Sequence, residues 1–425
     1  MSSILTNTSA MVALQTLRSI SSNLAKTQSE ISTGKTVGGA KDNAAIWSIS
    51  KVMESDVLGF KGISDSLALG NSTVAVAAAA AEKVTELLND MKQKIVAAQE
   101  SNVDRLKIQT DISALRGTIN SIVGAAQFNG LNLLSNSHTF TGTPTVADIV
   151  AQKGLSGQVN ILSSLDRSGG GVKATHIAAA RGDLGTKDLT AGAIAGLTVG
   201  TAVTGTGTAI ADGGSSTVTI AGENTTARGN SAVLVGDTYT VAGITGVSAT
   251  MTYVARDGDT VTDVAKALIA KVNYEAAKAG VKFSAALDGV SGIKFTNNTG
   301  ATASITPTFT TAMGGTAGGA LNLMADLNVT TENGAKAALT AIEHLTQVAI
   351  QAAANFGTAQ KRITIQQGFI NSLSDSLKAG IGSLVDADME EASARLQALQ
   401  VQQQLGIQAL SIANQSPQNI LALFR

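Results

Sequence analysis

The chain has 425 residues, no cysteine and a formal net charge of −1. Without cysteine it forms no disulfide and has no thiolate nucleophile or ligand, and its near-neutral charge gives no electrostatic basis for binding nucleic acid or an anionic membrane. Three histidines and an aromatic content of 3% argue against a histidine-based catalytic or metal site and against a base-stacking surface. The length is enough for about two to four domains.

The N-terminal residues Met1–Thr6 contain neither a basic nor an apolar segment, so no cleavable secretory signal is predicted. No apolar run approaches the ~20 residues that a membrane-spanning helix needs. We therefore expect a chain that does not insert into a membrane.

A stripe of residues separated alternately by four and three positions marks the first predicted helix. This spacing keeps one seam on one side of the helix, where a second helix can pack along it. An ordinary amphipathic helix on a globular core is the alternative. Gly34, Gly38 and Gly39 are expected to end the helix. The stripe consists of Asn7, Ala10, Leu14, Leu17, Ser21, Leu24, Gln28 and Ile31.

Three more helical segments are expected before residue 135. The first runs from about Asp42 to Leu69, where Gly70-Asn71 is expected to interrupt it. The next carries Leu88 and Met91 among its apolar residues. Ser101 and Asp104 have the spacing of a capping box, and the helix behind them carries Ile108, Ile112, Leu115, Ile119 and Ile122. A helical bundle is the natural architecture for these segments.

The composition changes between about Ser135 and Val329, where glycine and threonine become dense. Alternating residues at 238–241, 249–254 and 292–295 predict short strands separated by glycine-rich turns. One exception is the segment 261–279, which has helical spacing and follows a capping box of Thr260 and Asp263. The middle of the chain is thus predicted to be a mostly β module inserted between two halves of a helical domain.

The C-terminal quarter repeats the alternating spacing over a longer distance. Gln366 is the one polar member of its first stripe, Gly380 and Gly382 are expected to bend or break the helix, and Pro417 is expected to end or kink the helix that follows. The first stripe is Ile342, Leu345, Ala349, Ala352, Phe356, Ala359, Ile363, Gln366, Ile370, Leu373 and Leu377. The second is Val385, Met389, Ala392, Leu396, Leu399, Gln403, Gly406, Leu410 and Ala413. The seams at the two ends of the chain suit one another.

No catalytic constellation emerges from the sequence. The glycine clusters at 169–171 and 213–214 lack the Lys-Ser or Lys-Thr of a phosphate-binding loop, and neither H-E-x-x-H nor a G-x-S-x-G elbow with a plausible base is present. His344 follows Glu343 on the long predicted helix, where a place on a bundle face is the better interpretation. We expect no catalytic residue, no cofactor and no metal site, and therefore a protein that is not an enzyme.

Three segments resemble bacterial flagellin, the subunit of the flagellar filament. They are Ala40–Ala45 (AKDNAA), Gln127–Leu134 (QFNGLNLL) and the chain end Ala413–Arg425 (ANQSPQNILALFR). The match covers roughly residues 1–135 and 330–425 and leaves out the middle. The resemblance implies an α+β multidomain fold, in which long coiled-coil-like helices from both termini form a helical bundle and a mostly β outer domain is inserted.

The resemblance also implies a division of the chain. Residues 1–43 and 384–425 would form an inner coiled-coil domain, residues 44–135 and 330–383 a helical bundle domain, and residues 136–329 the variable outer domain. The expected self-assembly seam consists of Leu14, Leu17, Leu24, Ile31, Met389, Leu396, Leu399 and Leu410. The expected bundle core consists of Ile342, Leu345, Phe356, Ile363, Ile370, Leu373, Leu377, Leu88, Met91, Ile112, Leu115 and Ile119.

The function implied is that of a structural subunit that polymerises into the flagellar filament and serves swimming motility. Its expected partners are further copies of itself, the flagellar type III export apparatus with an export chaperone, and the filament cap and hook–filament junction proteins. Its expected location is extracellular, in the bacterial flagellum. Two alternatives remain: a hook–filament junction protein, which shares the helical termini, and a surface-binding, adhesin-like module in the outer domain.

One motif departs from the family pattern. Many flagellins carry an L-x-R-x-R-E-L stretch that Toll-like receptor 5 recognises, whereas residues 88–94 here read L-N-D-M-K-Q-K. Asp90 stands where an arginine is expected and reverses the charge. Strong recognition by this receptor is therefore not expected, and the chain resembles the alphaproteobacterial branch of the family.

Overall fold

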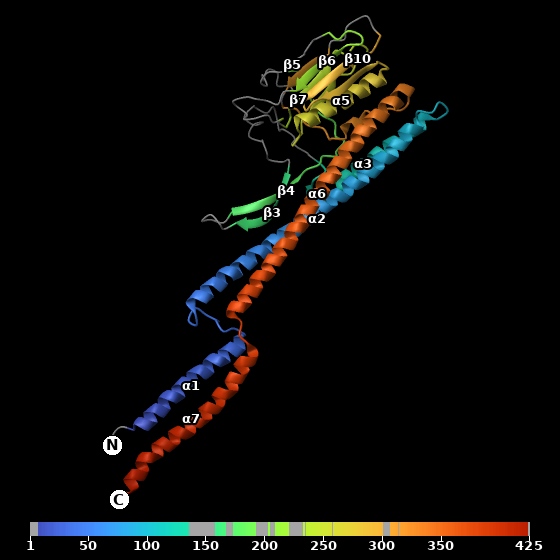
Figure 1. Ribbon diagram of the computed structural model, residues 1–425. Coiled ribbons are helices and arrows are strands. Elements are labelled where there is room, and N and C mark those ends of the chain that lie inside the picture. Colours follow the sequence, from blue (N-terminus) through green and yellow to red (C-terminus); the bar gives the residue numbers. More distant parts are fainter. Residues whose placement is uncertain are drawn as a thin grey trace. The chain divides into compact units, whose positions relative to one another are not determined.

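The structure is a computed structural model that describes residues 7–423 except for 136–157, 167–172, 193–202, 205–208, 221–232, 234, 257, 301–306 and 313. The chain divides into two compact units (Figure 1). The terminal unit consists of Met1–Ser64 with Gly368–Arg425, and the central unit of Asp65–Gln367. Within the described residues, no helix has the length and apolar character needed to cross a membrane.

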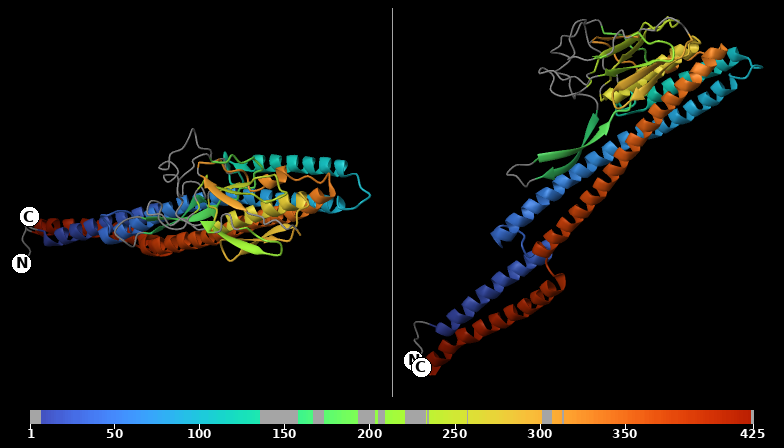
Figure 2. Two further views of the ribbon diagram at one scale, coloured as in Figure 1. Left: turned by 90° about the horizontal axis from the view of Figure 1, so that it is seen from above. Right: turned by 45° about the horizontal axis from the view of Figure 1, so that its top comes forward.

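Two antiparallel helices, α1 (Thr8–Thr33) and α7 (Met389–Leu423), make up most of the terminal unit. They lie side by side in every view (Figures 1 and 2). The unit also contains the beginning of α2 (Ala44–Ala97) and the end of α6 (Glu332–Val385). The expected end of the first helix is confirmed, because Gly34 adopts a left-handed conformation with φ 68° at the end of α1.

The two segments that connect these helices pair with one another. The Thr36 amide donates to the Val385 carbonyl at 2.8 Å, and the Ala387 amide donates to the Gly34 carbonyl at 2.9 Å. Lys35 and Asp386 thereby form an isolated antiparallel bridge. Each connection thus satisfies backbone groups of the other, and the bridge joins residues about 350 positions apart in the sequence.

The AKDNAA segment folds into the entry to α2. The Asp42 carboxylate accepts hydrogen bonds from the amides of Gly38 and Gly39, both at 3.1 Å. Asn43 Oδ1 accepts from the amides of Ala45 and Ile46 and caps the helix. The side chains of Asp42 and Asn43 therefore bind backbone amides of the chain itself and hold the entry to α2 in place.

The helices continue through glycines that were expected to interrupt them. Helix α2 runs through Gly70, and α6 runs through Gly380 and Gly382 to Val385; each helix has 54 residues. A glycine in a helix interior costs only about 1 kcal/mol, which tertiary packing can outweigh. The predicted interruptions at these sites are therefore wrong, and the joint near the C-terminus begins at Asp386 instead.

Helix α7 also continues past Pro417, to Leu423. A proline has no amide hydrogen, so the carbonyl four residues earlier, on Ala413, loses its helical donor. The side chain of Asn7 replaces it, because Asn7 Nδ2 donates to the Ala413 carbonyl at 2.8 Å. Asn7 Oδ1 also caps α1 by accepting from the Ala10 amide at 3.0 Å. One side chain thus satisfies groups of both helices.

The central unit contains a bundle of α2, α3 (Arg105–Ala125) and α6. Asp104 caps α3 by accepting from two amides, so the predicted capping box with Ser101 as first residue is wrong. Salt bridges join the helices, from Lys92 Nζ of α2 to Glu343 Oε1 of α6 at 2.5 Å and from Lys94 Nζ to Asp111 Oδ2 of α3 at 2.7 Å. All four side chains are exposed, so these pairs contribute little to stability.

The QFNGLNLL segment forms a tight hairpin after α3. Strands β1 (Gln127–Phe128) and β2 (Leu131–Asn132) pair across Asn129 and Gly130, whose φ angles are 51° and 79°. Asn-Gly is the preferred pair for a two-residue turn with positive φ at both positions. Asn132 Nδ2 also donates to the Val123 carbonyl at 2.7 Å, which fastens the hairpin to the end of α3.

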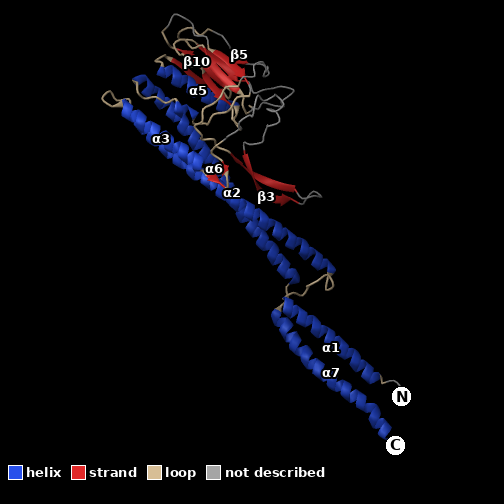
Figure 3. Cartoon of the chain, turned by 180° about the vertical axis from the view of Figure 1, so that it is seen from behind, coloured by secondary structure: helices blue, strands red, loops and turns tan. Residues whose placement is uncertain are grey.

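Within its described residues, the inserted β module contains a four-stranded and a three-stranded antiparallel sheet besides a separate two-stranded hairpin. Figure 3 shows its strands in red. The four-stranded sheet has the order β5 (Val203–Thr204), β6 (Ser215–Ile220), β10 (Gly292–Asn297) and β9 (Phe283–Asp288). The three-stranded sheet has the order β11 (Thr308–Ala312), β7 (Thr238–Ala242) and β8 (Met251–Val254). Helix α5 (Val261–Lys278) begins with the predicted capping box, in which Thr260 and Asp263 bond one another's backbone. The predicted fold class is confirmed.

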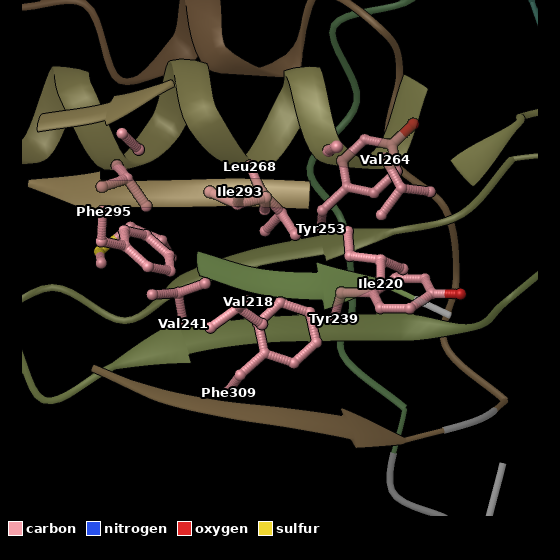
Figure 4. Close-up of a cluster of buried hydrophobic side chains, with 14 of the residues drawn as sticks. Val218, Ile220, Tyr239, Val241, Tyr253, Val264, Leu268, Ile293, Phe295 and Phe309 are labelled. Atoms are coloured by element: carbon pink, nitrogen blue, oxygen red, sulfur yellow. The ribbon is translucent and has the colours of Figure 1, made fainter. Parts of the chain in front are cut away.

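One hydrophobic core joins the sheets and α5 of this module (Figure 4). Val264 and Leu268 of α5 are fully buried with Ile293 of β10 and Val241 of β7. Phe283 and Phe295 stack with ring centroids 5.8 Å apart. Five of the thirteen aromatic residues of the chain lie in this core, where a small module needs large buried side chains.

A hairpin of β3 (Gln158–Asp166) and β4 (Lys173–Ala180) packs on the bundle. Ile161 lies against Gly70 of α2 so closely that a Cβ atom on Gly70 would lie 2.6 Å from Ile161. Gln366 of α6 donates through Nε2 to the Ser163 carbonyl at 3.0 Å. The hairpin therefore explains both the glycine inside α2 and the polar residue in the stripe of α6.

Substitution of Gly70 tests this packing. We expect Gly70→Ala to lower the free energy of unfolding by about 1–2 kcal/mol, because the clash with Ile161 outweighs the gain of about 1 kcal/mol in helix propensity. Gly62→Ala is the matched control in the same helix, since no atom lies within 4 Å of its added Cβ, and it should stabilise the chain. Urea unfolding measures both, and stabilisation by Gly70→Ala would contradict the packing.

Asn7 offers a second test. Asn7→Asp keeps the oxygen that caps α1 but loses the donor to the Ala413 carbonyl, so α7 should lose about 1 kcal/mol of local stability near Ala413. Asn7→Ala should also weaken the first turn of α1 by about 1 kcal/mol. Amide hydrogen exchange of the monomer measures the protection of α7 near Ala413 and of the first turn of α1 separately. Equal protection of α7 in Asn7→Asp and the unmodified chain would show that the Asn7 amide contributes nothing.

Candidate functional site

The two helices of the terminal unit meet along one stripe each, which we call the α1–α7 seam. On α7, Ala392 and Leu399 are buried, while Leu396, Gln403, Gly406, Leu410 and Ala413 are partly buried. On α1, Thr27 and Glu30 are buried, while Ala10, Ala13, Leu17, Ile20, Leu24 and Ile31 are partly buried. The steps of three and four residues match those of a coiled-coil interface.

The seam on α1 has a different phase from the one the sequence indicated. From Ala10 the chain steps first by three residues to Ala13 and then by four to Leu17, whereas the predicted stripe stepped by four to Leu14. Ala13, Ile20 and Thr27 thus occupy the places predicted for Leu14, Ser21 and Gln28, and Leu14 is 39% exposed. Spacing alone does not separate these phases, because both pass through Ala10, Leu17, Leu24 and Ile31.

Gly406 brings the two helices close together. A Cβ atom added at Gly406 would lie 3.1 Å from Cδ1 of Leu17 and 3.9 Å from Cδ1 of Ile20. This glycine, a weak member of the predicted stripe, is therefore a point of helix contact. Ala10, Ala13 and Ala392 are small as well, so much of the seam consists of closely spaced backbone with little buried side-chain volume.

A second set of apolar side chains on both helices faces away from this seam. Met11 and Val12 of α1 are 66% and 63% exposed. On α7 the exposed set consists of Val401, Leu405, Ile407 and Ile412, with 54–69% exposed. Val401, Leu405 and Ile412 are separated by four and seven residues and share the face of α7 opposite the seam. We call these three residues the outer apolar row.

The residues expected in the bundle core lie at different depths. Leu88, Met91, Ile112, Ile119, Ile342, Leu345, Phe356, Ile363 and Ile370 are each at most 2% exposed. Leu115, Leu373 and Leu377 are partly buried, and the last two lie in the terminal unit with Ile370.

Met389, expected in the seam, is the first residue of α7 and is 46% exposed. Asp90 is exposed on α2.

Charged groups of the terminal unit gather at the paired connections. Glu54 of α2 lies 2.6 Å from Lys51 Nζ and 3.7 Å from Lys35 Nζ. The hydrogen bond from Lys51 and the nearby positive charge of Lys35 hold the pKa of Glu54 below its usual range. These exposed pairs orient the connection weakly.

Among the described residues, no group of three potential metal ligands is present.

Comparisons with known proteins agree with this architecture. Residues 4–139 match the model of the bacterial flagellin N-terminal helical region, and residues 339–424 match that of the bacterial flagellin C-terminal helical region. The chain is 36% identical to a Flagellin A of Rhizobium meliloti and 30% identical to a flagellin of Brucella melitensis, each over the full length of both chains.

A solved FliC structure from Burkholderia pseudomallei is 14% identical, covering 69% of this chain and 99% of its own, with a TM-score of 0.30. Such a low score carries no conclusion about fold or function. The full-length sequence matches and the two helical-region models carry the assignment. The chain belongs to the bacterial flagellin family, the structural subunits of the flagellar filament.

Proposed function

We propose that the α1–α7 pair is the element through which copies of this chain assemble, with the outer apolar row as its contact to neighbouring subunits. The exposure of Val401, Leu405 and Ile412 carries this proposal. Rows of exposed large apolar side chains are unusual on a monomer and favour an interaction surface. A neighbouring copy is the occupant that a self-polymerising family supplies.

The geometry of assembly follows from the kind of interface. A contact between two different surfaces of the same chain does not close on itself, so copies continue to add and a filament results. Covering a Leu or Ile side chain completely contributes about 1.5–3 kcal/mol. Several such side chains per subunit are enough to stabilise α1 and α7, whose own seam buries few large groups.

We extend the proposal to the layers of the filament. Residues 1–43 and 384–425 form the inner coiled-coil layer, with Leu14 and Met389 contributing to contacts between subunits. Residues 44–135 and 330–383 form the surrounding helical layer, and residues 136–329 project outward. The exposed positions of Leu14 and Met389 in a single chain support their place in such contacts.

Partners and location complete the proposal. The chain passes through the flagellar type III export apparatus with the help of an export chaperone and becomes part of an extracellular filament. At the filament ends it contacts the cap and the hook–filament junction proteins. The absence of cysteine supports this route, because a chain without thiols can be exported unfolded without forming disulfides.

Recognition by Toll-like receptor 5 is proposed to be weak. Asp90 places a negative charge on the exposed face of α2 where the family pattern has an arginine. A receptor surface that binds an arginine would meet a like charge at this position, which costs affinity.

Two substitutions on α7 separate its two faces. Leu399→Asp places a carboxylate in the α1–α7 seam, where Leu399 is 8% exposed, so both pairing of the helices and polymerisation should be lost. Leu405→Asp alters the outer apolar row, so the monomer should keep its helical pairing while filament growth fails. Circular dichroism and hydrogen exchange report on the monomer. Sedimentation and electron microscopy of monomer added to short filament seeds report on growth.

Gln404→Asp is the matched control, because Gln404 is exposed and lies next to Leu405 but outside both apolar stripes. It introduces the same charge and should leave growth largely intact. Normal filaments from Leu399→Asp would rule out the seam as an assembly element. Normal filaments from Leu405→Asp would remove the outer apolar row from the interface and leave the seam untouched.

A further inference from the structure

A partly open cavity of about 350 Å³, lined by both polar and apolar groups, lies within the central unit. Its lining comes from four parts of the chain: the segment 180–183 at the end of β4, the region from β8 into α5, the segment 320–323, and one face of α6. The charged side chains in the lining are Arg181, Asp183, Arg256, Asp259, Asp263, Lys266 and Lys271. Family membership as a filament subunit gives no role to such a cavity.

The segment that carries Arg181 is held firmly in place. The amides of Gly182 and Leu184 donate to the carbonyls of Leu133 and Leu134 at 3.0 and 2.9 Å. Gly182 also approaches α6 so closely that an added Cβ would lie 2.9 Å from Cβ of Ala352. Arg181 thus lines the cavity on a fixed backbone, and its Nε is buried without a hydrogen-bond partner.

The carboxylates of the lining already have partners within the chain. Asp259 accepts from the Arg256 amide at 2.8 Å and forms an ion pair with the Arg256 guanidinium at 3.4 Å. Asp263 accepts from the Thr260 amide at 2.9 Å in the capping box of α5. Asp183 accepts from the Gly185 amide at 2.9 Å. These bonds leave the acidic groups with less capacity for an outside ligand.

The cationic side chains that line the cavity have fewer partners than the carboxylates. Arg256 pairs with Asp259, and Lys271 pairs with Asp326 at 3.7 Å. Lys266 of α5 has no ion pair within the described chain, and Arg181 has none either. Within the described residues, the cavity lining therefore has two positive side chains without an ion-pair partner, and they come from different parts of the chain.

The wall formed by α6 supplies neutral hydrogen-bonding groups. His344, Gln347, Gln351 and Asn355 follow one another at helical spacing along the cavity. Burial and the nearby cations Arg256 and Lys266 lower the pKa of His344 to about 4. The imidazole is therefore uncharged at neutral pH and can accept or donate a hydrogen bond there.

We infer that this cavity binds a small solute through an oxyanion group, a carboxylate or a phosphate. Arg181 and Lys266 donate charge-assisted hydrogen bonds to the oxyanion, and the amides of Gln347, Gln351 and Asn355 bind the remaining polar atoms. A volume of about 350 Å³ lies in the range of small-molecule sites. The bound solute would join the segment 181–183, α5 and α6, and so stabilise the attachment of the β module to the bundle.

Calorimetric titration of the full-length monomer tests the site. Inorganic phosphate and succinate are the probes, each at constant ionic strength set with chloride, so that binding is distinguished from screening. Arg181→Gln and Lys266→Gln should each weaken binding about tenfold, as expected for the loss of one charge-assisted hydrogen bond. Lys294→Gln is the matched control, because Lys294 is an exposed lysine on β10 and does not line the cavity.

The two probes separate the possible sources of the oxyanion. Preference for phosphate indicates a phosphorylated solute, and preference for succinate indicates a carboxylic acid. Absence of heat with both probes would overturn the proposal, as would binding that both cavity variants leave unchanged. Circular dichroism of each variant checks that it folds, and Lys266→Gln keeps the test valid if Arg181→Gln does not fold, since Lys266 is exposed.

The pKa of His344 supplies a second readout. The chain has only three histidines, so their imidazole signals can be assigned by nuclear magnetic resonance. The charged groups that line the cavity with His344 are Arg181, Arg256, Lys266, Lys271, Asp183, Asp259 and Asp263, and of these Arg256 and Lys266 lower its pKa. An oxyanion bound between Arg181 and Lys266 favours the imidazolium form, so the pKa of His344 should rise from about 4 when phosphate or succinate binds. An unchanged pKa at saturating probe would place the bound anion elsewhere.

Discussion

Antiparallel packing of α1 against α7 is the contact on which the terminal unit depends. It brings together Asn7 and Ala413, which are 406 residues apart in the sequence. Closing so long a chain costs conformational entropy that grows with the length of the loop. The seam offsets little of this entropy cost by itself, because its members include Thr27, Gln403 and Gly406, and its one buried leucine, Leu399, is still 8% exposed. A neighbour that covers the outer apolar row adds the burial that one chain lacks.

Glycine and proline residues that were expected to weaken or interrupt helices instead lie where other parts of the chain contact those helices. Gly70 leaves room for Ile161, and Gly406 allows α7 to approach Leu17. Pro417 removes a helical donor, and the Asn7 side chain replaces it. In each case the helix loses about 1 kcal/mol or more of stability at that residue, and a contact from a distant part of the chain offsets the loss. The helix-breaking residue therefore lies where another element contacts the helix.

The central unit joins its two kinds of structure through polar groups. The stripe of α6 that carries Ile342, Leu345 and Phe356 packs into the bundle, whereas His344, Gln351 and Asn355 on another face line the cavity under the β module. Tyr274 of α5 donates to the Asp326 carbonyl and accepts from the Asn328 amide just before α6. Directional hydrogen bonds therefore contribute to the attachment of the module to the segment before α6.

The sequence by itself determined the helical segments, the inserted β module and the stripe on α7. It also indicated buried residues of α2 and α6 such as Leu88 and Ile363, because hydrophobic spacing reports directly which face of an element is buried. Its motifs near Asp42, Asn129 and Pro417 identified the family. Tertiary structure alone decided that α2 and α6 continue through their glycines and that Ala13 rather than Leu14 faces α7. It also decided that Arg181, Lys266 and His344 surround one cavity. These outcomes depend on contacts between distant residues, such as Ile161 with Gly70, and local propensity contains no information about them.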